Sequence, residues 1–197
     1  MSSRRVRATA IGAALLLLAL VSASLAVTSR LTDPDDVAGV LDVREVKFSH
    51  PKGEPPSWTV ITASRWKVSA LWDRGYVFLE LDTKGFEPAD YYALIRSDGR
   101  KLLGELFKVA TKPGKPDPHV ANLTVWRKSH DGVSMKVPLK LMEFGRWRTF
   151  YRWWIVTSLT GEKCPTTCLD RVPDEGTVQQ WRPGMSPTPS PTATPTP

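Results

Sequence analysis

Short runs rich in β-branched and aromatic residues recur between Leu31 and Trp181, and Gly, Pro and Asp separate them. Several runs alternate apolar and polar positions, which is the period of a strand with one buried face. They predict about eight strands, at residues 41–48, 58–66, 76–81, 91–96, 101–110, 122–128, 133–137 and 150–159. No window has the period of an amphipathic helix of three turns, and only residues 140–144 favour a short helical turn.

The turns between these runs indicate antiparallel pairing. Asp98-Gly99 and Asp131-Gly132 each lie between consecutive runs, and Asp-Gly is a strong hairpin signal. Residues 76–81 are apolar on both faces, as in a central strand. We therefore expect an all-β domain over residues 31–181, built as an antiparallel two-sheet sandwich of jelly-roll or immunoglobulin-like type.

The first 26 residues follow a different pattern. Basic residues at positions 4, 5 and 7 precede a charge-free apolar helix candidate over residues 8–27. Ser24-Leu25-Ala26 is a small-x-small pattern that a signal peptidase would cut after Ala26. The same stretch is also long enough, at ~1.5 Å per residue, to span a ~30 Å hydrocarbon core as an uncleaved membrane anchor. Both interpretations place the domain outside the cytoplasm, either secreted or anchored to the membrane.

The other end of the chain is a low-complexity segment. Residues 186–197 contain only Ser, Pro, Thr and Ala, which bury too little apolar area to offset the entropy of ordering. We expect residues 182–197 to form a disordered tail. It is either a solvated end or an O-glycosylated or wall-embedded segment.

Composition narrows the class of protein. Eight Trp, six Phe and four Tyr require a hydrophobic core, which excludes a wholly disordered chain. The formal net charge is +7, but three arginines among the first seven residues contribute three of these charges. The remaining charges have both signs and are interspersed, which indicates a solvated surface and no nucleic-acid partner.

The chain contains no motif with a known catalytic chemistry. A nucleophile elbow, a His-Glu-x-x-His zinc motif and a P-loop are all missing from the sequence, and its three histidines lie in loops between the expected strands. Carboxylates cluster at Glu80, Asp82, Glu87 and Asp90. A pair of them at the right separation would suit glycoside hydrolysis, so a secreted hydrolase with a shallow carboxylate site remains the alternative to a non-catalytic domain.

Cys164 and Cys168 are the cysteines of the chain, and three residues that include Pro165 separate them. In an exported domain two nearby thiols usually pair, and a turn at Pro165 brings their Cα atoms within the ~4.4–6.8 Å that a disulfide needs. We expect a disulfide, with a half-assembled metal site as the alternative.

We expect no cofactor, and the one candidate that the aspartates offer is a structural calcium ion. Asp33, Asp35 and Asp36 crowd four residues, and Asp82 and Asp90 bracket the loop after a central strand. Calcium takes 6–8 oxygen ligands and is common in extracellular modules. Lys84 occupies an expected ligand position, however, and solvated aspartates that cap turns explain the same pattern.

Arg146, Trp147 and Arg148 form the candidate ligand-binding segment. Cations beside an aromatic ring suit stacking on sugars or bases, or contact with a membrane surface. The following residues 150–156 alternate and are better explained by core packing.

Three segments resemble an uncharacterised family of small secreted or membrane-anchored β-sandwich proteins of high-GC Gram-positive bacteria. They are Asp-Pro-Asp-Asp-Val-Ala-Gly-Val-Leu-Asp-Val-Arg at 33–44, Phe-Leu-Glu-Leu-Asp-Thr at 78–83 with Ala-Asp-Tyr-Tyr at 89–92, and Cys-Pro-x-x-Cys-Leu-Asp-Arg-Val-Pro-Asp at 164–174. Where the family has an Asp-rich loop, this chain has Lys-Gly-Phe-Glu-Pro at 84–88. The resemblance implies export and a β fold, and it implies no activity.

The leading hypothesis is a non-catalytic, extracytoplasmic binding or interaction module at the cell envelope, whose partner is an envelope polymer or protein. A membrane contact would run through the N-terminal segment if that segment is uncleaved. The hydrolase named above and a purely structural domain are the alternatives.

Overall fold

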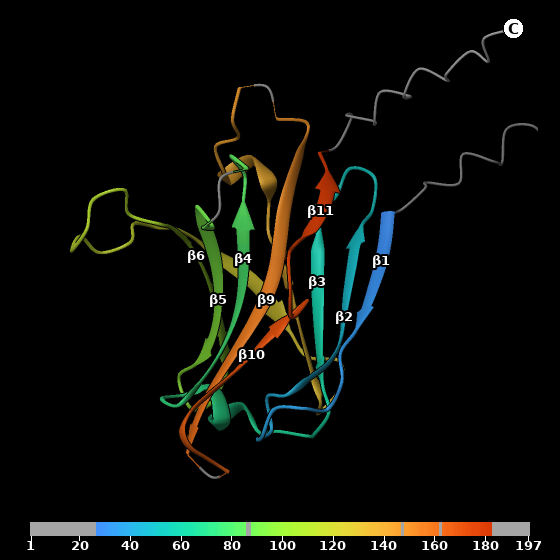
Figure 1. Ribbon diagram of the computed structural model, residues 1–197, viewed down its shortest axis with the longest axis vertical. Helices are drawn as coiled ribbons and strands as arrows, with labels where there is room; N and C mark the ends of the chain where they lie inside the picture. Colours follow the sequence, from blue (N-terminus) through green and yellow to red (C-terminus); the bar gives the residue numbers. More distant parts are fainter. Residues whose placement is uncertain (1–26, 86–87, 147, 162, 183–197) are drawn as a thin grey trace, which may run out of the picture.

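The computed structural model describes residues 27–85, 88–146, 148–161 and 163–182. Within these ranges the protein is all-β and its paired strands are antiparallel, which confirms the expected fold class (Figure 1). The strands are β1 (Val27–Thr32), β2 (Val43–His50), β3 (Ser57–Thr62), β4 (Gly75–Asp82), β5 (Tyr91–Ser97), β6 (Leu102–Lys108), β7 (His119–Trp126), β8 (Gly132–Lys136), β9 (Phe150–Gly161), β10 (Cys164–Val172) and β11 (Val178–Trp181). The described ranges also contain two short 3₁₀ helices, η2 (Val68–Leu71) and η3 (Leu139–Leu141).

The eight expected strands correspond to β2 through β9, and η3 overlaps the expected helical turn. The sequence analysis missed β1, β10 and β11. The candidate N-terminal helix and residues 183–197 of the tail lie outside the described residues. No helix in the described ranges is long and apolar enough to cross a membrane.

The two-sheet sandwich is not confirmed, because one sheet contains all the strands. Its order is β1-β2-β3-β8-β7-β6-β5-β4-β9-β10, and β11 also pairs with β9. Strand β7 joins the two halves, since residues 119–123 pair with β6 and residues 124–126 pair with β8. The sheet curves into a nearly closed barrel (Figure 1).

The end strands β1 and β10 do not pair, so the barrel remains open, and β10 contacts β2 without pairing with it. The Val43 N–H donates to Asp170 Oδ2 at 2.5 Å across this junction. We call the junction the seam, and it comprises the β1–β2 loop at residues 33–42, the start of β2 and the facing residues of β10.

The core lies inside the curved sheet. Trp153 of β9 is fully buried, and its ring centroid lies 6.0 Å from that of Trp58 and 6.0 Å from that of Phe48. These three rings come from both halves of the sheet, so they hold the halves together. Alternation then places every second residue of β4 and β5 on the outer face.

Candidate functional site

The β1–β2 loop packs closely against β9 and β10 at the seam. The Thr157 hydroxyl of β9 donates to the Leu41 carbonyl at 2.7 Å. Gly39 has a φ of +110°, and a Cβ atom added there would lie 2.6 Å from Leu159 Cδ2 and 3.1 Å from Cys164 Sγ. The sequence therefore needs glycine at this position for both conformation and space.

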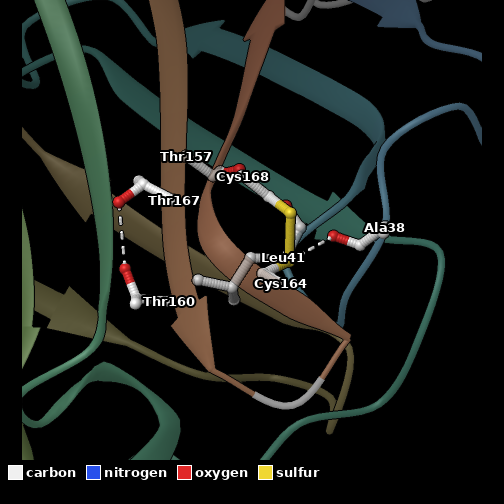
Figure 2. The surroundings of a disulfide bond; sticks show 7 residues. All are labelled: Ala38, Leu41, Thr157, Thr160, Cys164, Thr167 and Cys168. Carbon is white, nitrogen blue, oxygen red and sulfur yellow. Dashed lines mark hydrogen bonds between the residues drawn. A yellow bond between two sulfur atoms is a disulfide. The ribbon is translucent and has the colours of Figure 1, made fainter.

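The expected disulfide forms within β10. Cys164 and Cys168 are bonded, with their Cα atoms 5.6 Å apart. Figure 2 shows the bridge beside the loop, with Cys164 Sγ 2.9 Å from the Ala38 carbonyl oxygen. The pairing of β10 with β9 shifts register between the two cysteines, so the bridge spans a bulge. A disulfide indicates an oxidising compartment.

Three carboxylates meet at the seam. One oxygen from each of Asp33, Asp36 and Asp170 lies within 4.8 Å of the other two. Asp33 and Asp36 belong to the loop, and Asp170 lies on β10 with 3% of its surface exposed. Asp42 is 1% exposed, and neither of its carboxylate oxygens has a hydrogen-bond partner of good geometry. Asp33 Oδ2 is likewise buried and without a partner.

Burial, and then crowding, raises the pKa values of these carboxyls. Burial, followed by the nearby carboxyls of Asp170, Asp174, Asp36 and Asp42, raises the pKa of Asp33 from 3.8 to about 7. Burial and the adjoining Asp35 carboxyl raise the pKa of Asp42 to about 7, although the Val37 N–H opposes the rise. Burial also raises the pKa of Asp170. None of the ion pairs in the described ranges reaches these aspartates, so no basic side chain offsets their negative charge.

These shifts predict a pH dependence of the metal-free protein. A carboxyl whose pKa is higher when folded stabilises the fold at low pH, and this contribution disappears as the pH rises through about 7. The seam should therefore weaken between pH 5.5 and pH 8. His50, whose pKa is lowered by burial, acts in the opposite direction, so the test compares variants. Urea unfolding with chelator at both pH values should show a smaller loss of stability in Asp42→Asn than in the wild type, and an equal loss would contradict the assignment.

Asp82 and Asp90 do not join the carboxylate cluster of the seam. Asp82 Oδ1 accepts the backbone N–H groups of Lys84, at 3.0 Å, and of Gly85. Asp90 Oδ1 accepts the Thr83 hydroxyl at 2.7 Å, and its Oδ2 accepts the N–H groups of Thr83 and Lys84 at 3.1 Å each. Both carboxylates thus stabilise the β4–β5 turn, which is the alternative that the sequence left open.

The candidate ligand-binding arginines line a shallow pocket next to this turn. Arg146 and Arg148 border it together with Lys84, Glu143 and Phe150. The Arg148 guanidinium also lies 5.1 Å from the centroid of the Phe150 ring. Trp147 lies outside the described residues. The structure thus places Arg146 and Arg148 beside a concavity and adds a packing contact for Arg148, and ligand binding there stays a prediction.

A row of rings on the outer face of β4 to β7 was not predicted. Neighbouring ring centroids lie 6.0 Å apart for Tyr76–Phe78, 6.2 Å for Phe78–Tyr92, 5.2 Å for Tyr92–Phe107 and 5.4 Å for Phe107–His119. The first four residues are half-buried and His119 is exposed. We call these five residues the ring row. The signal that could have found it is the apolar character of both faces at residues 76–81.

Polar groups surround the ring row. In the strand register Glu80 lies opposite Tyr92, and Glu105 lies opposite Leu94 and Asn122. The Tyr92 hydroxyl donates to Asp117 at 3.0 Å, and burial, followed by this bond, raises the Tyr92 pKa to about 12. The face therefore combines flat apolar rings with hydrogen-bonding side chains.

Comparisons with protein-family models, with curated proteins and with solved structures found no match to this chain. The function is therefore inferred from the geometry above.

Proposed function

We propose that this protein is a non-catalytic extracytoplasmic domain that binds a glycan polymer of the cell envelope along the ring row. The N-terminal segment exports it and either leaves it secreted or anchors it to the membrane. The disulfide supports export, and the resemblance to small exported proteins of high-GC Gram-positive bacteria agrees with it.

The observation that carries the proposal is the ring row itself. Inward positions of the same strands are filled by fully buried residues such as Leu79, Ala93 and Leu106, so the rings are not needed to fill the core. Ordinary outward positions carry polar side chains, whereas this face presents a continuous apolar strip across four strands.

Sugar rings fit this chemistry best among the candidate partners. The apolar C–H face of a pyranose stacks on an aromatic ring, and its hydroxyls bond to side chains such as Glu80, Glu105 and Asn122 beside the strip. A repeating polymer also matches a row of several rings better than a compact ligand does. Because most of these rings are half-buried and each packs against a neighbouring ring, little side-chain entropy is lost on binding.

The test is a binding measurement on the full-length protein with purified peptidoglycan and with soluble envelope polysaccharides. Phe107→Ala and Tyr92→Ala should each weaken binding about tenfold or more, since base–aromatic stacking of comparable area is worth ≈ 1–3 kcal/mol per ring. The matched control is Trp72→Ala, which removes an exposed ring outside the sheet and should leave binding unchanged.

Three results would contradict the proposal. One is unchanged polymer binding in both ring-row variants that remain folded. Another is release of soluble fragments from the polymer, which would favour the hydrolase. The third is binding that is lost in Arg146→Ala but kept in the ring-row variants, which would place the ligand in the pocket next to the β4–β5 turn.

A further inference from the structure

The seam gathers buried carboxylates where the barrel fails to close. We propose that the seam binds one calcium ion, held by the carboxylates of Asp33, Asp36 and Asp170, and that the ion fastens the β1–β2 loop to β10. This inference is independent of the ring row, which lies on the outer face of other strands.

The geometry of the three oxygens suits a single ion. Calcium binds oxygen at about 2.3–2.6 Å, so two oxygens on one ion lie at most about 5 Å apart. The three carboxylates place oxygens within 4.8 Å of one another without any movement of the backbone. The loop supplies two of these ligands and β10 supplies the third, so an ion here links segments far apart in the sequence.

The burial of Asp42 is a second observation that favours a cation at this site. The Asp42 carboxylate, next to the cluster, is 99% buried and has no hydrogen-bond partner of good geometry. Its nearest polar neighbours are the carboxyls of Asp35 and Asp170 and the Val37 N–H, so no positively charged group is among them. A buried carboxylate without a partner is costly, and a protein normally retains one only where a positive charge or a proton compensates it. No Lys or Arg in the described ranges supplies that charge through an ion pair.

The donor set identifies the class of ion. All the candidate ligands are carboxylate oxygens, which suit hard cations and not zinc, whose sites favour Cys and His. Magnesium demands a near-ideal octahedron and usually takes one or two carboxylates with several waters. Three converging carboxylates with a fourth beside them therefore favour calcium.

The ion would add a further link between the β1–β2 loop and β10, beside the contacts already present at the seam. Asp170 accepts the Val43 N–H at the start of β2, and Thr157 and the disulfide contact the loop at Leu41 and Ala38. The Val43 N–H stabilises one oxygen of Asp170, but none of these contacts brings a positive charge to the carboxylates. An ion at Asp33, Asp36 and Asp170 would remove that repulsion and add a cross-link where strand pairing is missing.

The experiment measures calcium binding and thermal unfolding of the full-length protein after treatment with chelator. Calcium should raise the unfolding midpoint in a saturable way, with a dissociation constant no weaker than about 10⁻³ M. Asp36→Asn should weaken binding at least tenfold. Asp36 is exposed, and its side chain accepts no hydrogen bond within the described residues. The fold therefore does not depend on it, and this variant should still fold. Asp170→Asn should abolish binding, and it is the more disruptive variant because Asp170 holds Val43.

The matched control is Asp82→Asn, an aspartate that stabilises the β4–β5 turn and should leave calcium affinity within twofold of the wild type. An unfolding midpoint that does not change in 10 mM calcium would overturn the proposal. Equal calcium affinity in folded Asp36→Asn would also overturn it. Stabilisation by magnesium or zinc to the same extent as by calcium would overturn the choice of ion.

Discussion

Alanine in place of Trp153 should lower the free energy of unfolding by about 3–5 kcal/mol, the usual cost of removing a buried tryptophan. The side chain is fully buried and packs against Trp58 and Phe48, with both centroid distances at 6.0 Å. The indole nitrogen of Trp153 has no hydrogen-bond partner, so the loss is one of packing. Because the partners lie on the other half of the sheet, the cavity would open between the two halves.

Urea unfolding at fixed pH and calcium concentration measures this loss. The control is Trp72→Ala, whose side chain is 58% exposed and whose removal should change stability by no more than about 0.5 kcal/mol. A loss below about 1 kcal/mol in Trp153→Ala would show that the rings do not hold the halves together.

The strands in the middle of the sheet were predictable because each carries its own pattern. In β4 and β5 every second residue is buried, and this alternation is visible without knowledge of the neighbours. The Asp98-Gly99 turn between β5 and β6 was predictable for the same local reason.

The missed strands depend on their partners. β1 has mostly exposed residues and pairs with β2 alone, and β10 contains Pro165, the disulfide and a register shift. β11 has only four residues. The sequence also could not predict that one sheet contains all the strands. β7 changes its partner strand between Leu123 and Thr124, and the residue pattern of β7 itself does not mark this change.

Among the carboxylates of the seam, too, those close together in sequence were predictable, and the one contributed by a distant strand was not. Asp33 and Asp36 were found because they are close in sequence. Asp170 was missed because it lies far from these aspartates in sequence, as its bond to Val43 across 127 residues shows. Asp82 and Asp90 were included on spacing alone, and in the structure each accepts backbone N–H groups of its own turn through one oxygen.

All three segments that carry the family resemblance supply residues described here, and two of them meet at the seam. The segment at 33–44 contains Asp33, Asp36 and Asp42, and the segment at 164–174 contains the disulfide and Asp170. Short motifs that looked unrelated along the chain are therefore parts of one structural unit, which fastens the edge of the sheet.

Gly39→Ala tests how tightly this unit is fastened, and it should destabilise the protein by about 2–4 kcal/mol. A φ of +110° is costly for any residue with a Cβ atom, by about 1–3 kcal/mol. The added methyl group would also lie 2.6 Å from Leu159 Cδ2, and relief of such a clash costs about 1–3 kcal/mol more. Reduced freedom of the unfolded chain offsets about 0.4–1 kcal/mol of this.

Gly53→Ala is the matched control, because Gly53 has a φ of +80° but no atom within 4 Å of the added Cβ. It carries the conformational cost alone, so the difference between the two variants measures the contact of the loop with β9 and the disulfide. Urea unfolding of both variants should place Gly39→Ala at least about 1 kcal/mol below Gly53→Ala. Equal stability would mean that the loop moves away from Leu159 at no cost, and that the seam is held by its carboxylates and not by packing.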